Sequence, residues 1–413
     1  MQLITTDVSH QSKALIGKVL NKLQGLNKPR KYFMIHIMSL YLSIRGRYTF
    51  QGLSRYGGKC EKSYRLQFEK PFDYLAFNIE LCGSHLSEEL ILAFDPSYLP
   101  KSGKHTPNLG KFWSGCLGKA VKGLEIGGLA VVDLAHNTAF NLEAIPTPSP
   151  EELQTKGLSL VDHYAEAIVE RSSDIATLSS YLAVDGYFAK QSFIDPIMEK
   201  TDLQLISKLR SDANLKYFYN GPKKTGKGRP KKFDGKVDTK NIDQSRFELA
   251  HCDGQTRVYQ ALLWSVGLKR KINVAYVEFW DNGAFTGRYA IFFSTDLKIS
   301  ASRIYQYYKA RFQIEFLFRD AKQHVGLTHC QARSKNKMHF HANASLTAVS
   351  IAKIAHYINN ENQPDTYSIA DVKTLYFNER MLNLFFESFQ VNPEIEKNKQ
   401  AIDAILYYGA IAA

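Results

Sequence analysis

The order of apolar runs between residues 88 and 200 limits the folds open to this chain of 413 residues. Six segments follow one another as strand, strand, strand, helix, strand and helix: residues 90–97, 127–135, 141–148, 160–172, 179–188 and 193–200. The strand-like segments are short and bounded by turn residues, whereas the first helical segment has apolar residues at i, i+3 and i+7. The pattern therefore predicts an α/β fold.

The same order of elements is that of an RNase H-like core, and we expect this topology here. Residues 201–298 contain short apolar runs separated by Asp253-Gly254 and Asn282-Gly283 turn signals, which predict a β-rich insertion. The remaining segments read as helical. The predicted units are listed in chain order: a helical N-terminal region (1–85), the first part of the core (86–200), the insertion (201–298), a helical second part of the core (299–345) and a helical C-terminal region (346–413).

The net charge favours a polyanionic partner. Lys and Arg total 53 against 40 Asp and Glu, a formal charge of +13. Nucleic acid and an anionic membrane surface both fit such an excess. Hydrophobic residues make up 44% of the chain and aromatic residues 12%, which excludes a disordered basic tail as its main feature.

Cysteine usage and hydropathy point to a cytoplasmic, nucleoid-associated protein. The five cysteines are scattered and form no CxxC pair, so neither a zinc ribbon nor a disulfide framework is encoded. The longest apolar-looking run, Tyr32 to Ile44, contains His36 and is too short to span a bilayer. No secretory signal is visible at the N-terminus. We therefore expect no membrane partner.

The basic N-terminal region has two interpretations. A break at Gly57 and Gly58 separates a short helix from another that carries Arg65 and Lys70, which is compatible with a helix-turn-helix that binds DNA. The alternative is a helical cap whose basic residues are only solvated.

The sharpest signal lies on one helix expected over residues 300–326, with Ser300 or Ser302 as its N-cap and Gly326 at its end. At 100° per residue, five polar side chains fall within an arc of about 80°: Tyr308, Arg311, Glu315, Arg319 and Lys322. The rest of the circumference is apolar, with Phe312, Ile314, Phe316, Leu317 and Phe318. This pattern predicts a buried helix that lines a polar site, and a solvated charged face is the alternative.

A carboxylate flanked by cations suits a site that holds a divalent metal ion and phosphate. Glu315 would need further carboxylates from nearby strand ends. Asp95 and Asp185 each end an apolar β run, and Asp133 looks similar by pattern. Spacing alone does not exclude Asp133.

The spacing of Tyr308, Arg311, Glu315 and Lys322 reproduces the Y-(2)-R-(3)-E-(6)-K signature. In this the chain resembles the bacterial insertion-sequence DDE transposases of the Tn5-transposase-like group, over about residues 88 to 330. The resemblance implies a catalytic and metal-binding triad of Asp95, Asp185 and Glu315. It also implies that Tyr308 stacks on or supports a displaced base, and that Arg311 and Lys322 grip the DNA backbone.

The resemblance further implies an enzyme that uses two Mg²⁺ ions for phosphodiester chemistry, with Mn²⁺ as a substitute. Such an enzyme cuts the ends of its insertion sequence and joins the 3′-hydroxyl ends to target DNA, as a homodimer in the synaptic complex. One departure is the segment after Asp185, DGYFAK, where only Lys190 supplies the charge common in the group. The alternatives are a non-catalytic DNA-binding protein derived from a transposase and a metal-dependent nuclease without strand transfer.

Weaker signals lie in three loops or runs. GPKKTGKG from Gly221 resembles a Walker A loop but ends in Gly228, so nucleotide binding is disfavoured. Residues 227–232, with Arg229, resemble the Arg-Pro core of an AT-hook, and a solvated lysine loop fits equally well. Lys101, Lys104 and His105 either meet DNA or lie in a simple exposed loop. Trp264 and Trp280 are expected in the core, with a wedge into DNA as the alternative.

Overall fold

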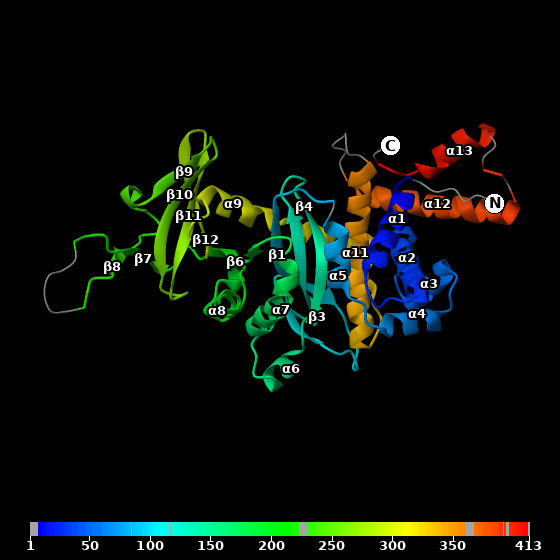
Figure 1. Ribbon diagram of the computed structural model, residues 1–413, viewed down its shortest axis with the longest axis horizontal. Coiled ribbons are helices and arrows are strands. Elements are labelled where there is room, and N and C mark those ends of the chain that lie inside the picture. The colour runs from blue at the N-terminus through cyan, green and yellow to red at the C-terminus, as the bar shows by residue number, and fades with distance from the viewer. Residues whose placement is uncertain are drawn as a thin grey trace.

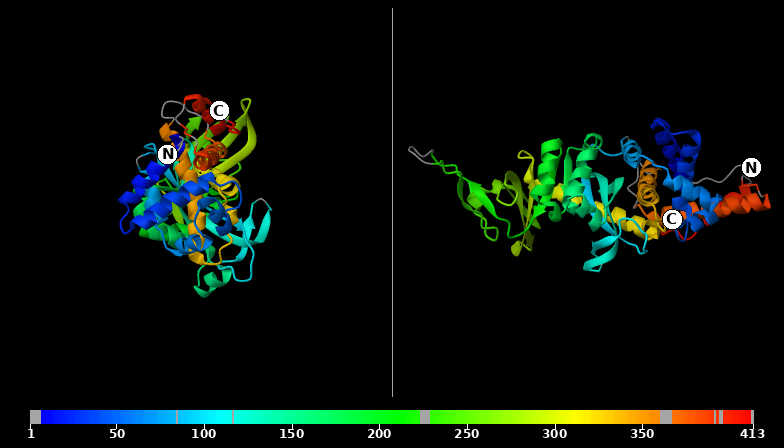
Figure 2. Two further views of the ribbon diagram at one scale, coloured as in Figure 1. Left: turned by 90° about the vertical axis from the view of Figure 1, so that its right-hand side faces the viewer. Right: turned by 90° about the horizontal axis from the view of Figure 1, so that it is seen from below.

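The computed structural model describes residues 7–83, 85–115, 117–222, 229–359, 367–390, 392–393 and 396–411. A sheet of twelve strands runs through the molecule, with a bundle of helices at one end. Figure 1 shows the insertion strands on the left, the core sheet in the centre and the N-terminal and C-terminal helices on the right. Figure 2 shows the same elongated arrangement from below. None of the described helices is long and apolar enough to cross a membrane.

Five strands form the core sheet in the order β4-β3-β1-β5-β6. Their bounds are β1 (Leu90–Pro100), β3 (Lys119–Asp133), β4 (Thr138–Pro146), β5 (Tyr181–Val184) and β6 (Gln204–Leu209). β3 is antiparallel to β1 and β4, whereas β5 is parallel to both β1 and β6. The fold is thus a mixed α/β arrangement with flanking helices, consistent with the predicted RNase H-like core.

The structure adds two strands to the sequence interpretation of the core. β2 (Gly110–Ser114) pairs with β3 and follows the loop that contains Lys104. β6 falls in the segment read as insertion, yet it pairs in parallel with β5. Central parallel strands are buried on both faces, which explains why the runs of β1 and β5 are almost continuously apolar.

Helices cover both faces of the core sheet, and two consecutive glycines of β3 allow them to come close. A Cβ at Gly127 would overlap Tyr164 of α7 (Leu160–Ile175), and one at Gly128 would overlap Phe318 of α10 (Gln313–His324). Successive strand residues face opposite sides, so α7 and α10 lie on opposite faces. α6 (Pro150–Thr155) precedes α7, and α8 (Gln191–Lys200) packs against it.

The β-rich prediction for the insertion is confirmed. Its strands are β7 (Leu215–Phe218), β8 (Phe233–Lys236), β9 (Glu248–Cys252), β10 (Thr256–Ser265), β11 (Arg270–Asp281) and β12 (Ala284–Ser294). β12 pairs with β6, so the insertion continues the core sheet. Asn282 and Gly283 turn the β11–β12 hairpin with φ of 47° and 78°. Positive φ at both turn residues is the geometry that Asn-Gly favours.

The terminal regions are helical, as predicted. The N-terminal helices are α1 (Asp7–Lys22), α2 (Lys28–Ser43), α3 (Phe50–Gly57), α4 (Glu61–Glu69) and α5 (Tyr74–Cys82). α11 (Lys335–Asn359) packs against α1, α2, α4, α5 and β4 and so joins this bundle to the core sheet. α12 (Ile369–Phe389) and α13 (Glu396–Leu406) follow. Residue 346, where we expected a unit to begin, lies inside α11.

The prediction of a single helix over residues 300–326 is wrong in one respect. The helix is divided into α9 (Ala301–Ala310) and α10 (Gln313–His324). Around the break the hydrogen bonds span three residues: Phe312 N to Lys309 O (3.1 Å), Ile314 N to Arg311 O (3.1 Å) and Glu315 N to Phe312 O (3.0 Å). This tightening is typical of a 3₁₀ turn, and a periodic pattern does not reveal it. Ser300 caps α9, and Gly326 follows α10 with φ of 67°.

Candidate active site

Two aspartates lie side by side because their strands are parallel neighbours. Phe94 of β1 pairs with Val184 of β5, so the next residues, Asp95 within β1 and Asp185 just after the end of β5, are neighbours across the two strands. Asp185 ends its strand as the N-cap of a short 3₁₀ helix (Gly186–Phe188), and its carbonyl accepts a hydrogen bond from Ser207 Oγ at 3.1 Å. The pairing of β1 with β5 thus sets the backbone positions of both aspartates.

Arg311, at the break between α9 and α10, connects this edge to Glu315. Its Nη1 lies 3.4 Å from Asp95 Oδ1, and its Nη2 lies 3.6 Å from Glu315 Oε1. Only 8% of the Arg311 side chain is exposed, against 42% for Glu315. Arg311 Nε is buried and has no hydrogen-bond partner among the described residues. One guanidinium therefore bridges a strand carboxylate and a helix carboxylate.

Tyr308 connects the same helix to the second aspartate. Its hydroxyl donates a hydrogen bond to Asp185 Oδ1 at 3.3 Å, and its ring packs against Phe292. Burial raises the pKa of Tyr308 to about 12, so the hydroxyl stays protonated as a donor. In the structure Tyr308 is half-buried, and its hydroxyl contacts Asp185.

Several carboxylates lie close together at this site and give it a concentrated negative charge. Burial raises the pKa of Asp95 to about 7, and the charges of Glu315, Asp185 and Glu125 act in the same direction, while Arg311 opposes them. Burial also raises the pKa of Glu315. A carboxylate whose ionised form is disfavoured by burial is typical of functional sites. A bound cation would relieve this strain.

Carboxylate oxygens suit a hard divalent cation, and Asp95, Asp185 and Glu315 all contact the segment of Tyr308 and Arg311 or belong to the helix that follows it. Among the residues that the structure describes, however, no group of three or more His, Cys, Asp or Glu side chains is gathered closely enough to hold a metal ion. Arg311 already pairs with Asp95 and Glu315. An ion shared by these carboxylates therefore requires Arg311 to release them.

Two other cations of the predicted stripe have separate surroundings. Lys322 Nζ donates a hydrogen bond to Ser97 Oγ at 2.8 Å, and Ser97 shares the face of β1 that carries Asp95. Arg319 pairs with Asp320 at 3.1 Å and stacks on Phe316. The break in the helix and the exposure of Phe312, at 47%, also show that the helix is less buried than we expected.

Asp133 lies at the other end of the sheet. It pairs with Leu90 at the start of β1, whereas Asp95 lies near the middle of that strand. Ser87 N and Oγ donate to its carboxylate at 2.8 and 2.7 Å, and His136 Nδ1 lies 2.9 Å away. Although burial raises the pKa of Asp133, these hydrogen bonds hold it below its usual range. Its role in the described structure is to fix a turn.

Residues 161–351 match a protein-family model described as the transposase DDE domain. The match supports a DDE transposase family. The matched range contains Asp185, Tyr308, Arg311 and Glu315 and begins after Asp95. No curated protein matches the chain.

The other DNA contacts predicted from the sequence are scattered. Lys101 is held by the carbonyl oxygens of Cys330 and Ala332, so it is a clamp within the protein. Lys104 and Arg229 are exposed, and residues 223–228 of the basic loop lie outside the described ranges. Lys190 Nζ lies 3.9 Å from the centre of the Tyr187 ring.

The tryptophans of the insertion are half-buried, which differs from the expected core positions. Trp264 packs against Phe233, and Arg257 stacks on Trp280 at 3.5 Å. Stacking on a guanidinium leaves one face of Trp280 covered. Neither side chain is therefore free in this arrangement to act as a wedge without moving.

Sequence reasoning missed Glu125, a buried carboxylate in β3. It accepts a hydrogen bond from Tyr164 OH at 3.0 Å, and burial raises its pKa. Its negative charge helps to raise the pKa of Asp95. The available signal was a lone Glu inside the apolar run GLEIGGLAVVD.

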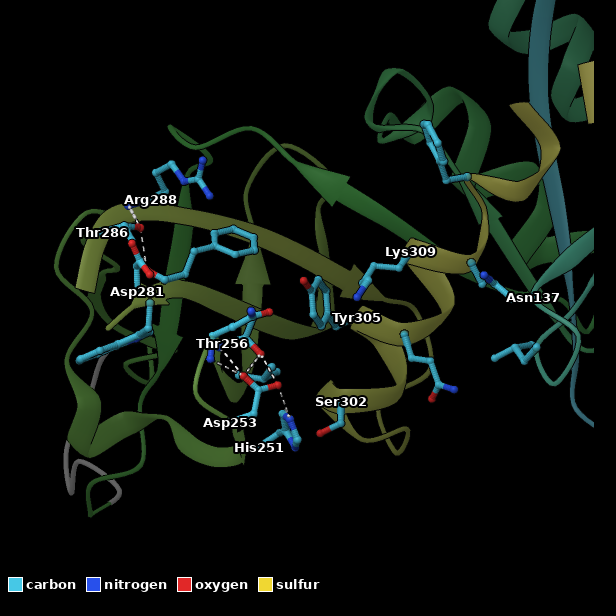
Figure 3. Close-up of a pocket in the computed structure, with 18 of the residues that line it drawn as sticks. Asn137, His251, Asp253, Thr256, Asp281, Thr286, Arg288, Ser302, Tyr305 and Lys309 are labelled. Carbon is cyan, nitrogen blue, oxygen red and sulfur yellow. Dashed lines mark hydrogen bonds and ion pairs between the residues drawn. The ribbon is translucent and has the colours of Figure 1, made fainter. Parts of the chain in front are cut away.

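A cavity of about 1130 Å³ lies beside this site, between the insertion and α9. Figure 3 shows Tyr305 and Lys309 of α9, with Asp253 of the β9–β10 turn and Thr256 at the start of β10 opposite them. The cavity reaches Phe312 and Asn137, next to the helix break. It is therefore an open space bordering the element that carries Arg311.

Proposed function

We propose that this chain is a DDE transposase of the Y-(2)-R-(3)-E-(6)-K group, which cleaves the ends of its insertion sequence and joins the 3′-hydroxyl ends to target DNA. One observation carries the proposal: side chains of one helical segment, Arg311 and Tyr308, bind Asp95 within β1 and Asp185 at the end of the neighbouring parallel strand β5. These contacts link the two Asp residues and Glu315 through Tyr308 and Arg311 of the signature. The family match supports the same reading from the sequence side.

In the proposed mechanism, Asp95, Asp185 and Glu315 would hold Mg²⁺, or Mn²⁺ in its place. The bound ion would supply Lewis-acid activation of the attacking oxygen and of the phosphodiester. Tyr308 keeps Asp185 oriented through its hydroxyl. Arg311, once released from the carboxylates, is placed to neutralise a phosphate oxygen, and Lys322 can do the same beside Ser97.

The buried carboxylate of Asp95 argues against a non-catalytic DNA-binding protein derived from a transposase. Asp95 is 21% exposed and its carboxylate is ionised only against a raised pKa, which costs stability in a protein without a use for it. A nuclease without strand transfer remains the rival, because hydrolysis needs the same carboxylates.

The deciding experiment uses Glu315→Gln, with the exposed Glu199→Gln on α8 as a control of equal charge change. Because Gln is a poor ligand for a divalent ion, we expect cleavage of element-end DNA in Mg²⁺ to fall more than about 100-fold in the Glu315 variant. Binding of the same DNA should persist. Cleavage at the parental rate would remove Glu315 from the proposed triad.

Incubation of labelled, pre-cleaved end DNA with a supercoiled plasmid then separates the two enzyme functions. Joined products in the parent and in Glu199→Gln, absent in Glu315→Gln, are expected for a transposase. Cleavage without joined products would identify a nuclease.

We also propose that the functional form is a homodimer bound to DNA, with contact through one face of α12. Four apolar side chains on that helix are 45–68% exposed: Met381, Leu384, Phe385 and Phe389. The buried Leu382 and Phe386 form a separate cluster with Ile402 and Leu406 of α13. An exposed apolar patch of this kind is typical of an interaction site.

For the organisation of the chain, we propose an inserted β-rich unit that begins after β6, near residue 210, and ends before α9. β6 then belongs to the catalytic core, because it pairs with β5. The helical region before residue 86 is proposed to bind DNA through its basic residues.

A further inference from the structure

A second groove, of about 1110 Å³, lies where α4, the end of β1, β3 and the start of α11 meet. Five basic side chains line it: Arg65, Lys101, Lys122, Arg333 and Lys337. Its described lining contains no Asp or Glu, and Ser102, Thr106 and Gln331 add neutral polar groups. Residues far apart in the sequence thus build one positively charged surface.

Most of this charge is not neutralised. Arg65 pairs with Glu61, and Lys337 pairs with Glu69 at 2.7 Å. Lys122 and Arg333 are exposed and form no ion pair within the described ranges of the chain. Exposed ion pairs are weak, so Arg65 and Lys337 can also exchange their partners for phosphate.

Lys101 connects two of the segments that line the groove. Its Nζ donates to the carbonyl oxygens of Cys330 and Ala332, which ties the end of β1 to the segment before α11. Burial lowers the pKa of Lys101. The lysine therefore holds two walls together and leaves Lys122 and Arg333 as the accessible cations.

The groove lies on the same strand as the candidate active site. Asp95 and Pro100 are five residues apart on β1, and the Lys322–Ser97 hydrogen bond lies between them. At about 3.3 Å per strand residue this separation is about 17 Å. With about 3.4 Å per base pair along duplex DNA, it corresponds to about five base pairs.

We propose that this groove binds the sugar–phosphate backbone of duplex DNA about five base pairs from the phosphodiester that Asp95, Asp185 and Glu315 act on. The position rests on the proposed transposase function, whereas binding to duplex DNA does not. The cations come from four separate elements along an open groove, which suits an extended polyanion better than a single phosphate.

The first test measures how affinity depends on salt. A duplex of about 30 random base pairs is titrated with the full chain carrying Glu315→Gln, so that no cleavage occurs, at several salt concentrations. The groove variant adds Lys122→Gln and Arg333→Gln. The control adds Lys200→Gln and Lys298→Gln, two exposed lysines outside the groove, with the same loss of charge.

We expect the slope of log K against log salt to fall by about two units in the groove variant and to stay unchanged in the control. Equal slopes in the groove variant and its parent, with both proteins folded by circular dichroism, would overturn the proposal. Inorganic phosphate at constant ionic strength should not displace the duplex. Displacement would identify a site for a single phosphate and also overturn it.

A second test locates the contact. Ethylation of single phosphates in element-end DNA should interfere with binding about five base pairs from the mapped cut, and this interference should vanish in the groove variant. Interference that persists in the variant places the contact elsewhere and contradicts the proposal. Failure of the transposase function is distinguishable, because a chain that cuts no DNA can still show the slope change.

Discussion

At the scale of single residues, Arg311 decides the character of the site. The guanidinium is almost fully buried and bridges Asp95 and Glu315, so two carboxylates are kept close without a metal ion. Removal of such a bridge would leave buried negative charges uncompensated. The same arrangement lets one side chain exchange carboxylates for phosphate when a cation binds.

The pKa of Asp95 gives a prediction for stability in EDTA. Its folded value of about 7 lies above the ordinary 3.8, so the folded state binds this proton more tightly than the unfolded state. The contribution to stability is full below about pH 4 and is lost as the pH rises to about 7, by up to about 4 kcal/mol.

Asp95→Asn should remove this loss, since the amide does not ionise. Urea unfolding from pH 4 to pH 8 should therefore show a smaller decline for Asp95→Asn than for the parent, while Glu199→Gln follows the parent. Parallel profiles for all three proteins would contradict the raised pKa.

At the scale of elements, α12 has two apolar faces of different kinds. One packs on α13, and the other exposes Leu384, Phe385 and Phe389 to solvent. Figure 1 shows this helix at the outer end of the bundle, away from the core sheet. Burial of these side chains against a second copy would contribute about 25 cal/mol for each Å² of apolar area.

A charge on this face tests the proposed dimer. Phe385→Glu should shift the chain from dimer to monomer in sedimentation velocity with DNA ends present, because the carboxylate would be buried without a partner. Leu249→Glu, at an exposed apolar position on β9, is the matched control and should leave the dimer intact. A dimer unaffected by Phe385→Glu places the interface elsewhere.

At the scale of the whole molecule, Tyr48 joins three regions. Its hydroxyl lies 2.9 Å from Tyr41 O, 3.2 Å from Ile44 O and 3.0 Å from His324 O at the end of α10. Lys373 of α12 donates to the same hydroxyl. The N-terminal bundle, the helix of Glu315 and the C-terminal helix are therefore tied at one point.

Loss of this hydroxyl should weaken the whole assembly. Tyr48→Phe is expected to lower the free energy of unfolding by about 1 to 3 kcal/mol, because buried carbonyls and a buried ammonium lose a partner. Urea denaturation measures the change, and Tyr32→Phe at an exposed position is the control. Equal midpoints for Tyr48→Phe and the parent would show that the hydroxyl is dispensable.

Much of the fold was predictable from local patterns. The runs around Asp95 and Asp185 are apolar because both faces of central strands are buried, and Asn282-Gly283 marks a hairpin because both residues tolerate positive φ. Ser300 and Gly326 mark helix ends through hydrogen bonding and backbone freedom. No Gly or Pro marks the break at Arg311. The pairing of β6 with β12 depends on a strand that is distant in sequence.

By itself, the sequence determined which residues could do the chemistry: two aspartates at strand ends and a Tyr, Arg, Glu and Lys at fixed helical spacing. Side-chain type and periodicity are local properties, so they can be read directly from the sequence. Tertiary structure alone decided how those residues are used. It placed Arg311 between two carboxylates, turned Arg319 to Asp320, closed Lys101 onto backbone carbonyls and gathered Lys122 and Arg333 into one groove. These outcomes depend on distances and burial between elements far apart in the chain, which no local pattern encodes.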